Sequence, residues 1–190
     1  IVDEDELPNG ITDGDTTDTT VSGAAGTLSA LVNFGADGPG SFGLSGNTAS
    51  LTDQGLTSGG VALSYNVVGN VLTANAGAAP IFTLTVGADG SYSFALLGPL
   101  DHPQPGSTDD NQLLNQPIDF SGVLTATDGD NDPVGAFGTG SFVINVEDDV
   151  PVVGVNPEAK AVSATVDESY LPPFGDGVHS AIIAAVDVQG

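Results

Sequence analysis

Acidic residues outnumber basic residues so strongly that charge is the first constraint on how this chain folds. Lys160 is the only lysine or arginine among 190 residues, against 25 aspartates and glutamates, which gives a formal net charge of −24 at pH 7. Repulsion on this scale keeps a chain disordered when apolar residues are scarce. Hydrophobic residues make up 39% of this chain, so we expect it to fold once its carboxylates are solvated or neutralised by cations.

The same charge excludes several classes of partner and site. A strongly acidic surface repels nucleic acid and anionic membranes and attracts cations. No run of about 18 apolar residues is present, so we expect no membrane insertion. There is no cysteine, which excludes disulfides and zinc–thiolate sites. Residues 1–6 are acidic and unlike a signal peptide, and the chain does not begin with Met, so we expect a fragment of a longer protein.

Apolar and polar residues alternate with a period of two along much of the chain, which is typical of β-strands. Two pairs of alternating runs flank short glycine-containing turns and predict antiparallel hairpins over 61–75 and 81–96. Alternation over 118–126 and 142–146 predicts two more strands, the first with Phe120 and Val123 on opposite faces. Further short strands are expected near 27–34, 48–52, 71–75, 152–155, 161–166 and 181–188. This pattern predicts an all-β fold, an antiparallel β-sandwich.

An internal repeat indicates how the chain is divided. The residues Val2-Asp3-Glu4 with Leu7-Pro8 recur as Val166-Asp167-Glu168 with Leu171-Pro172. Repeats in series imply an array of similar domains. We therefore predict one domain over 1–151, and over 152–190 a linker with the start of a second, truncated or split repeat. Residues 98–117 contain four prolines and are expected to form a long loop.

The sharpest motif is the sequence TDGDNDP at 127–133, between two predicted strands. Carboxylates at Asp128, Asp130 and Asp132 can converge on one cation, and Ca²⁺ takes about six to eight such oxygen ligands. The loop is not an EF-hand, because Pro133 stands where that motif needs glycine and Thr139 where it needs glutamate. The alternative is a polar turn whose aspartates bond their own backbone.

Two further acidic clusters lie at the ends of the predicted first domain. One follows the strand over 142–146, and the other opens the chain and recurs at the start of the second repeat. Placing Asp148 and Asp149 beside Asp167 and Glu168 would create a calcium site at a domain junction, whereas the alternative is a flexible, solvated linker. The predicted calcium ligands are Asp3, Glu4, Asp128, Asp130, Asp132, Glu147, Asp148, Asp149, Asp167 and Glu168.

The remaining acidic positions favour less specific interpretations. Asp37 and Asp89 each lie alone in a glycine-containing turn and are expected to be turn residues. A looser set of aspartates lies at 13, 15 and 18. Asp101-His102, together with the aspartates at 109 and 110, offers metal ligands on the long loop, but an ordinary surface loop is the favoured interpretation.

Nothing in the sequence indicates catalysis. The two histidines, His102 and His179, are far apart, and neither a G-x-S-x-G elbow nor a phosphate-binding loop is present. Paired carboxylates can hydrolyse glycosides, but a chain without tryptophan and with three tyrosines offers little surface for sugar stacking. We therefore expect that the protein is not an enzyme.

Taken together, the motifs resemble the long repeat domain of giant RTX adhesins exported by type I secretion. The resemblance spans about 2–151, and the chain lacks the G-G-x-G-x-D array of such proteins. It is carried by VDEDELP at 2–8, NFGADG at 33–38, LTSGG at 56–60, ADGSYSF at 88–94, PLDH at 99–102, TATDGD at 125–130 and VEDDVP at 146–151.

The resemblance implies an Ig- or cadherin-like β-sandwich that calcium stiffens, on the surface of a Gram-negative bacterium. It implies an extender module that projects ligand-binding domains for adhesion and biofilm formation. Its partners would be Ca²⁺ and neighbouring repeats of the same chain, with host or biofilm glycans or peptides bound through other domains. Two alternatives stay open: a calcium-dependent sugar- or peptide-binding module that uses the 98–117 loop, and a salt-adapted spacer without a specific metal.

Overall fold

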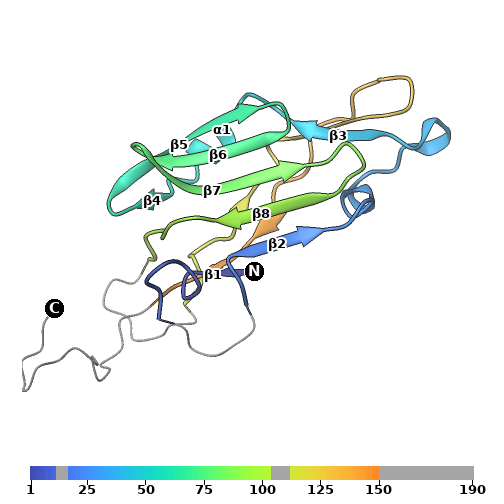
Figure 1. Ribbon diagram of the computed structural model, residues 1–190. Helices are drawn as coiled ribbons and strands as arrows, with labels where there is room; N and C mark the ends of the chain where they lie inside the picture. Colours follow the sequence, from blue (N-terminus) through green and yellow to red (C-terminus); the bar gives the residue numbers. More distant parts are fainter. Residues whose placement is uncertain (12–16, 104–111, 150–190) are drawn as a thin grey trace, which may run out of the picture. The chain divides into compact units, whose positions relative to one another are not determined.

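The computed structural model describes residues 1–11, 17–103 and 112–149, and shows a mostly β protein with almost no helix (Figure 1). The predicted linker and second repeat at 152–190, including Asp167, Glu168 and the three strands expected there, lie outside the described residues. Among the described residues, no helix is long and apolar enough to cross a membrane.

The largest element is a curled, six-stranded antiparallel sheet that forms a half-barrel (Figure 1). Its strands run in the order β2 (Thr20–Gly23), β8 (Tyr92–Leu96), β7 (Ala79–Val86), β6 (Val71–Ala76), β5 (Val61–Val68) and β4 (Thr57–Ser58). Both predicted hairpins are confirmed: β5 and β6 close at Val68 opposite Val71, and β7 and β8 close at Val86 opposite Tyr92.

Three two-stranded sheets accompany the large sheet. Two are antiparallel, pairing β3 (Ser41–Leu44) with β10 (Leu124–Thr127) and β9 (Ile118–Asp119) with β11 (Val143–Ile144). The third pairs β1 (Val2–Asp3) with β12 (Val146–Glu147), and these two strands are parallel. The strand expected over 142–146 thus forms as two short strands, and Phe142, Ile144 and Val146 are buried.

Aromatic rings join the large sheet to the small ones. Phe82 of β7 and Phe94 of β8 lie on the inner face, with ring centroids 5.3 Å apart. Phe120, just after β9, lies 6.0 Å from Phe82 and 5.9 Å from Phe94, and Phe142 lies 5.8 Å from Phe120. All four rings are buried. Burying a side chain of this size contributes about 1.5–3 kcal/mol, so this cluster fixes how the small sheets cover the large one.

Two segments predicted as strands are helical turns. Residues 27–34 contain the 3-10 helix η1 (Leu28–Leu31), followed by η2 (Gly35–Asp37), and 48–52 contain α1 (Ala49–Thr52). In η1 and α1 a single leucine is buried, Leu28 and Leu51 respectively. A segment that buries only one side chain does not need the alternating faces of a strand. Its conformation is therefore decided by local hydrogen bonds. The amide of Ser29 donates to the carbonyl of Gly26, and the amide of Ala49 donates to Asn47 Oδ1.

The predicted strand over 118–126 is interrupted, and the expectation for Val123 was wrong. Its side chain is fully buried, like that of Phe120, rather than on the opposite face. The amide of Ser121 donates to Asp119 Oδ1, and the amides of Val123 and Leu124 both donate to the carbonyl of Phe120. This turn breaks the alternation, so residues three apart point to the same side.

Candidate metal sites

The parallel pair β1–β12 brings the start of the chain beside the acidic segment at 147–149. Val2 pairs with Val146 and Asp3 with Glu147, and the amide of Glu4 donates to the carbonyl of Glu147 over 3.2 Å. Because parallel strands end at the same edge, the acidic residues of both segments gather there. We call this group the terminal carboxylate cluster; it comprises Asp3, Glu4, Glu147, Asp148 and Asp149.

The predicted junction site therefore has a different geometry in the described residues. Asp148 was expected beside Asp167 and Glu168, which lie outside the described residues, and here it lies beside Glu4 of the same domain. Asp149 Oδ1 accepts a hydrogen bond of 3.3 Å from the amide of Ile11. The acidic residues of the first strand are thus part of this domain's own packing.

Glu4 is the most unusual carboxylate of the cluster. Its side chain is 3% exposed, and its Oε1 accepts a 2.7 Å hydrogen bond from the amide of Leu100. Burial raises the pKa of Glu4 from 4.5 to about 8, and the negative charges of Asp148, Asp149 and Asp3 add to the rise, while the Leu100 amide opposes it. A cation close to Glu4 would favour its ionised form.

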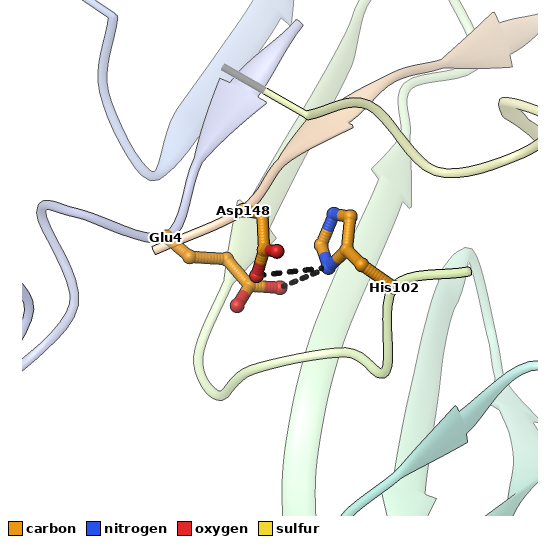
Figure 2. A group of neighbouring side chains, drawn as sticks. All are labelled: Glu4, His102 and Asp148. Atoms are coloured by element: carbon orange, nitrogen blue, oxygen red, sulfur yellow. Dashed lines mark ion pairs between the residues drawn. The ribbon is translucent and has the colours of Figure 1, made fainter. Parts of the chain in front are cut away.

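His102 supplies the third side chain of this site (Figure 2). Its ring is 2% exposed, and its Nδ1 lies 3.3 Å from Asp148 Oδ1 and 3.9 Å from Glu4 Oε1. The carbonyl oxygen of Leu100 lies 3.2 Å from Nδ1, and that of Val146 lies 3.3 Å from Nε2. The sequence favoured an ordinary surface loop here, whereas the structure buries the His102 side chain. The only signal in the sequence was the motif PLDH itself.

Asp101 fixes the segment that carries His102. Its two carboxylate oxygens each accept a 2.8 Å hydrogen bond, from the amides of Gly59 and Gly60, and its own amide donates to the carbonyl of Thr57. A hydrogen bond with the Thr57 side chain, and then those from the amides of Gly60 and Gly59, lower the pKa of Asp101. Gly59 and Gly60 have φ values of 56° and 74°, which suit glycine in the turn between β4 and β5.

The loop after β10 brings together the three aspartates that the sequence singled out. Carboxylate oxygens of Asp128, Asp130 and Asp132 lie within 4.8 Å of one another, and Asp130 and Asp132 are exposed. A bridge between Thr127 and Pro133 closes the loop, and Asn131 has a φ of 75°. The three carboxylates are therefore placed to bind one cation from the surface.

The same loop also bonds its own backbone, as the alternative interpretation expects. Asp128 Oδ1 accepts hydrogen bonds from the amides of Asp130, over 3.3 Å, and Asp132, over 2.8 Å. A hydrogen bond between the two carboxyl groups lowers the pKa of Asp128 and raises that of Asp130. The carboxyl groups of Asp128 and Asp130 therefore lie close together, in the place where a cation would act.

Glycine is required at position 129 of this loop. The amide of Gly129 donates to the carbonyl of Asp37 over 2.8 Å, and a Cβ at Gly129 would lie 2.6 Å from that oxygen. The turn around Asp37 therefore supports the aspartate loop through its backbone. Asp89 is a turn residue as predicted, because its Oδ1 accepts hydrogen bonds from the amide and hydroxyl of Ser91.

Of the other candidate residues, the structure describes Asp18 alone. The carbonyl of Asp18 accepts the amide of Asp3, while the aspartates at 13, 15, 109 and 110 and His179 lie outside the described residues.

Comparison with known proteins identifies one family. Its sequence profile, described as Domain of unknown function (DUF5801), matches residues 1–137. No curated protein and no solved structure matches the chain. The matched region contains Glu4, His102 and the aspartate loop, and it ends before Asp148. Because the match covers well over half of the sequence, this chain belongs to the DUF5801 family.

Proposed function

We propose that this protein is a calcium-rigidified extender module of a bacterial cell-surface adhesin, which projects ligand-binding domains for adhesion and biofilm formation. It acts outside the cell and has no enzymatic activity. The observation that carries the proposal is the convergence of Asp128, Asp130 and Asp132 in an exposed loop of a very acidic β domain. The resemblance of the short motifs to RTX adhesin repeats supports the same function.

The chemistry of the aspartate loop favours calcium. All three side chains offer hard oxygen ligands, and the exposure of Asp130 and Asp132 leaves room for water to complete the coordination of a large cation. A calcium ion would compensate the charges of Asp128 and Asp130 and hold the loop in one conformation. Extracellular calcium modules bind at about 10⁻⁴–10⁻³ M, so such a site fills outside the cell.

The architecture suits a module in a series. Small sheets pack against the large sheet through the phenylalanine cluster, which supports an Ig- or cadherin-like β-sandwich. Because β1 and β12 are parallel, a chain that enters at Val2 leaves at Glu147 travelling in the same direction. Neighbouring repeats of the same chain are the expected partners.

Calcium titration calorimetry tests the proposal at the loop. The full 190-residue chain, stripped of metal, is expected to bind Ca²⁺ in the millimolar range or tighter, and Asp130→Asn is expected to lose one site. Asp53→Asn is the matched control, because Asp53 is an exposed aspartate outside the loop and its replacement changes the net charge equally. Identical calcium binding by all three proteins would refute the assignment.

A groove supports the sugar- or peptide-binding alternative as a second candidate. It has a volume of about 490 Å³ and is lined by Ser50, Asp53, Gln54, Gly55, Leu56, Thr57, Asp101, Pro103, Leu114, Asn115 and Gln116. Much of this lining comes from the segment 98–117 that the alternative names. Binding of glycans or peptides on an array that is lost in Asn115→Trp, which fills the groove, would favour this function, and binding unaffected by the substitution would exclude the groove.

A further inference from the structure

Three side chains from distant parts of the sequence meet in a buried place that the aspartate loop does not share. Glu4 follows β1, His102 belongs to the segment after β8, and Asp148 follows β12. Their ligand atoms lie within 4.8 Å of one another, and the three side chains point toward a common centre (Figure 2). Their side chains are 3%, 2% and 21% exposed, respectively.

We propose that Glu4, His102 and Asp148 form a second metal site, which binds a divalent transition metal ion of the zinc class. The proposal does not rest on the calcium function. Both carboxylates were predicted calcium ligands, but the imidazole changes the preference. Calcium takes oxygen ligands, whereas a set of one imidazole and two carboxylates is typical of zinc.

The spacing of the ligand atoms fits a small ion. Zinc lies about 2.0–2.2 Å from nitrogen and oxygen ligands, so two ligands of a tetrahedral ion are about 3.4 Å apart. His102 Nδ1 lies 3.3 Å from Asp148 Oδ1 and 3.9 Å from Glu4 Oε1. The site therefore needs to contract only slightly around the ion. The carbonyl oxygen of Leu100, 3.2 Å from Nδ1, is a further oxygen at the same place.

The surroundings of His102 orient the ring for metal binding. A proton on Nε2 would be donated to the carbonyl oxygen of Val146, which lies 3.3 Å away. The lone pair of Nδ1 then faces the carboxylates of Glu4 and Asp148. Histidines that bind metals commonly donate their second nitrogen to a carbonyl or carboxylate in this way. In that tautomer the Nδ1 lone pair faces three oxygen atoms, an arrangement that a cation at Nδ1 would stabilise.

Charge supports the same conclusion. A buried carboxylate beside a second one is costly unless a cation compensates them. A divalent ion between Glu4 and Asp148 would compensate the charges of both acids together. The alternative to a metal ion is a proton on Nδ1, which would make His102 an imidazolium. Zinc titration distinguishes the metal ion from the proton.

Zinc titration of the full chain in millimolar calcium tests the site, because calcium fills the all-oxygen sites first. We expect one tight zinc equivalent in the natural protein and in His179→Gln, and at least about tenfold weaker binding in His102→Gln. His179→Gln is the matched control, since the chain has two histidines. Equal zinc affinity in His102→Gln and the natural protein would overturn the proposal, as would no binding at one equivalent.

A second readout does not require the His102 variant to fold. In His179→Gln, the imidazole NMR signals that remain belong to His102. We expect one equivalent of zinc to shift these signals, and Co²⁺ to give a visible absorption band from nitrogen coordination. Ring signals that report an imidazolium and do not change with zinc would show that a proton, rather than a metal, holds Glu4 and Asp148 together.

Discussion

Val2 and Val146 face each other on two parallel strands, and both side chains are fully buried. This pair joins the first and last described strands of the domain. It also sets the register that places Glu4 beside Asp148, because each acid follows its valine by two residues. The pairing of these valines thus fixes the positions of Glu4 and Asp148. A substitution that destabilises the β1–β12 pair should therefore also disturb the site.

Removing part of this contact should destabilise the domain. Val2→Ala leaves a cavity in the core, for which we expect a loss of about 2 kcal/mol in the free energy of unfolding, measured in urea. Val143→Ala is the control, because Val143 is 40% exposed. Similar effects of the two substitutions would mean that the β1–β12 pair does not contribute to the core.

The pH dependence of stability should reveal buried Glu4. Its pKa is raised from 4.5 to about 8, so the folded protein holds this proton more tightly than the unfolded chain. The stabilisation is complete below about pH 4.5 and is lost as the pH rises to about 8. In excess chelator, we expect stability to fall by up to about 1.4 kcal/mol per pH unit within this window.

Glu4→Gln is the control for this titration. Its amide oxygen can still accept the hydrogen bond from the Leu100 amide, but the side chain does not ionise. Subtracting its pH profile from that of the natural protein should leave the fall between pH 4.5 and 8. A difference that is flat across this range would contradict a raised pKa for Glu4.

Asp101 should position His102 through the glycine turn. Asp101→Ala removes the hydrogen bonds from the amides of Gly59 and Gly60, and we expect a loss of about 1 kcal/mol, because the group is exposed. Faster hydrogen exchange of these two amides should accompany a weaker zinc response. Asp53→Asn is expected to change neither quantity. Unchanged hydrogen exchange in Asp101→Ala would show that the Asp101 carboxylate does not protect the amides of Gly59 and Gly60.

A methyl group at position 129 should disturb the aspartate loop. In Gly129→Ala the new Cβ would meet the carbonyl oxygen of Asp37, so the loop must move, at an expected cost of about 1–3 kcal/mol and with weaker calcium binding. Gly135→Ala is the matched control, since nothing lies within 4 Å of its Cβ position. Calorimetric calcium titration of both variants checks the prediction. Equal calcium affinities would show that calcium binding does not depend on the conformation of this loop.

What the sequence predicted correctly is local. The two hairpins follow from alternation and from turn residues within a few positions, and the loop at 128–132 needs only adjacent residues to bring its carboxylates together. The helical turns at Leu28 and Leu51 were missed because each buries a single leucine. One buried residue produces no repeating pattern that could distinguish a helix from a strand. The turn at Phe120 was missed because Asp119 bonds the backbone and breaks the strand.

The site at Glu4 was only partly predictable. Both acidic segments are visible in the sequence, but a parallel pairing of strands so far apart leaves no local signal. The burial of His102 depends on Asp101 reaching the amides of Gly59 and Gly60, a contact across about forty positions that alternation does not encode.

The most direct test of the calcium mechanism is a thermal melt of the full chain in EDTA, in Mg²⁺ and in Ca²⁺ at constant ionic strength. We predict a clear rise in Tm with calcium alone, corresponding to about 1.4 kcal/mol or more when the ion is tenfold above its Kd, and a smaller rise in Asp130→Asn. Equal melting temperatures in all three conditions would contradict calcium rigidification and leave an acidic β domain that is stable without the ion.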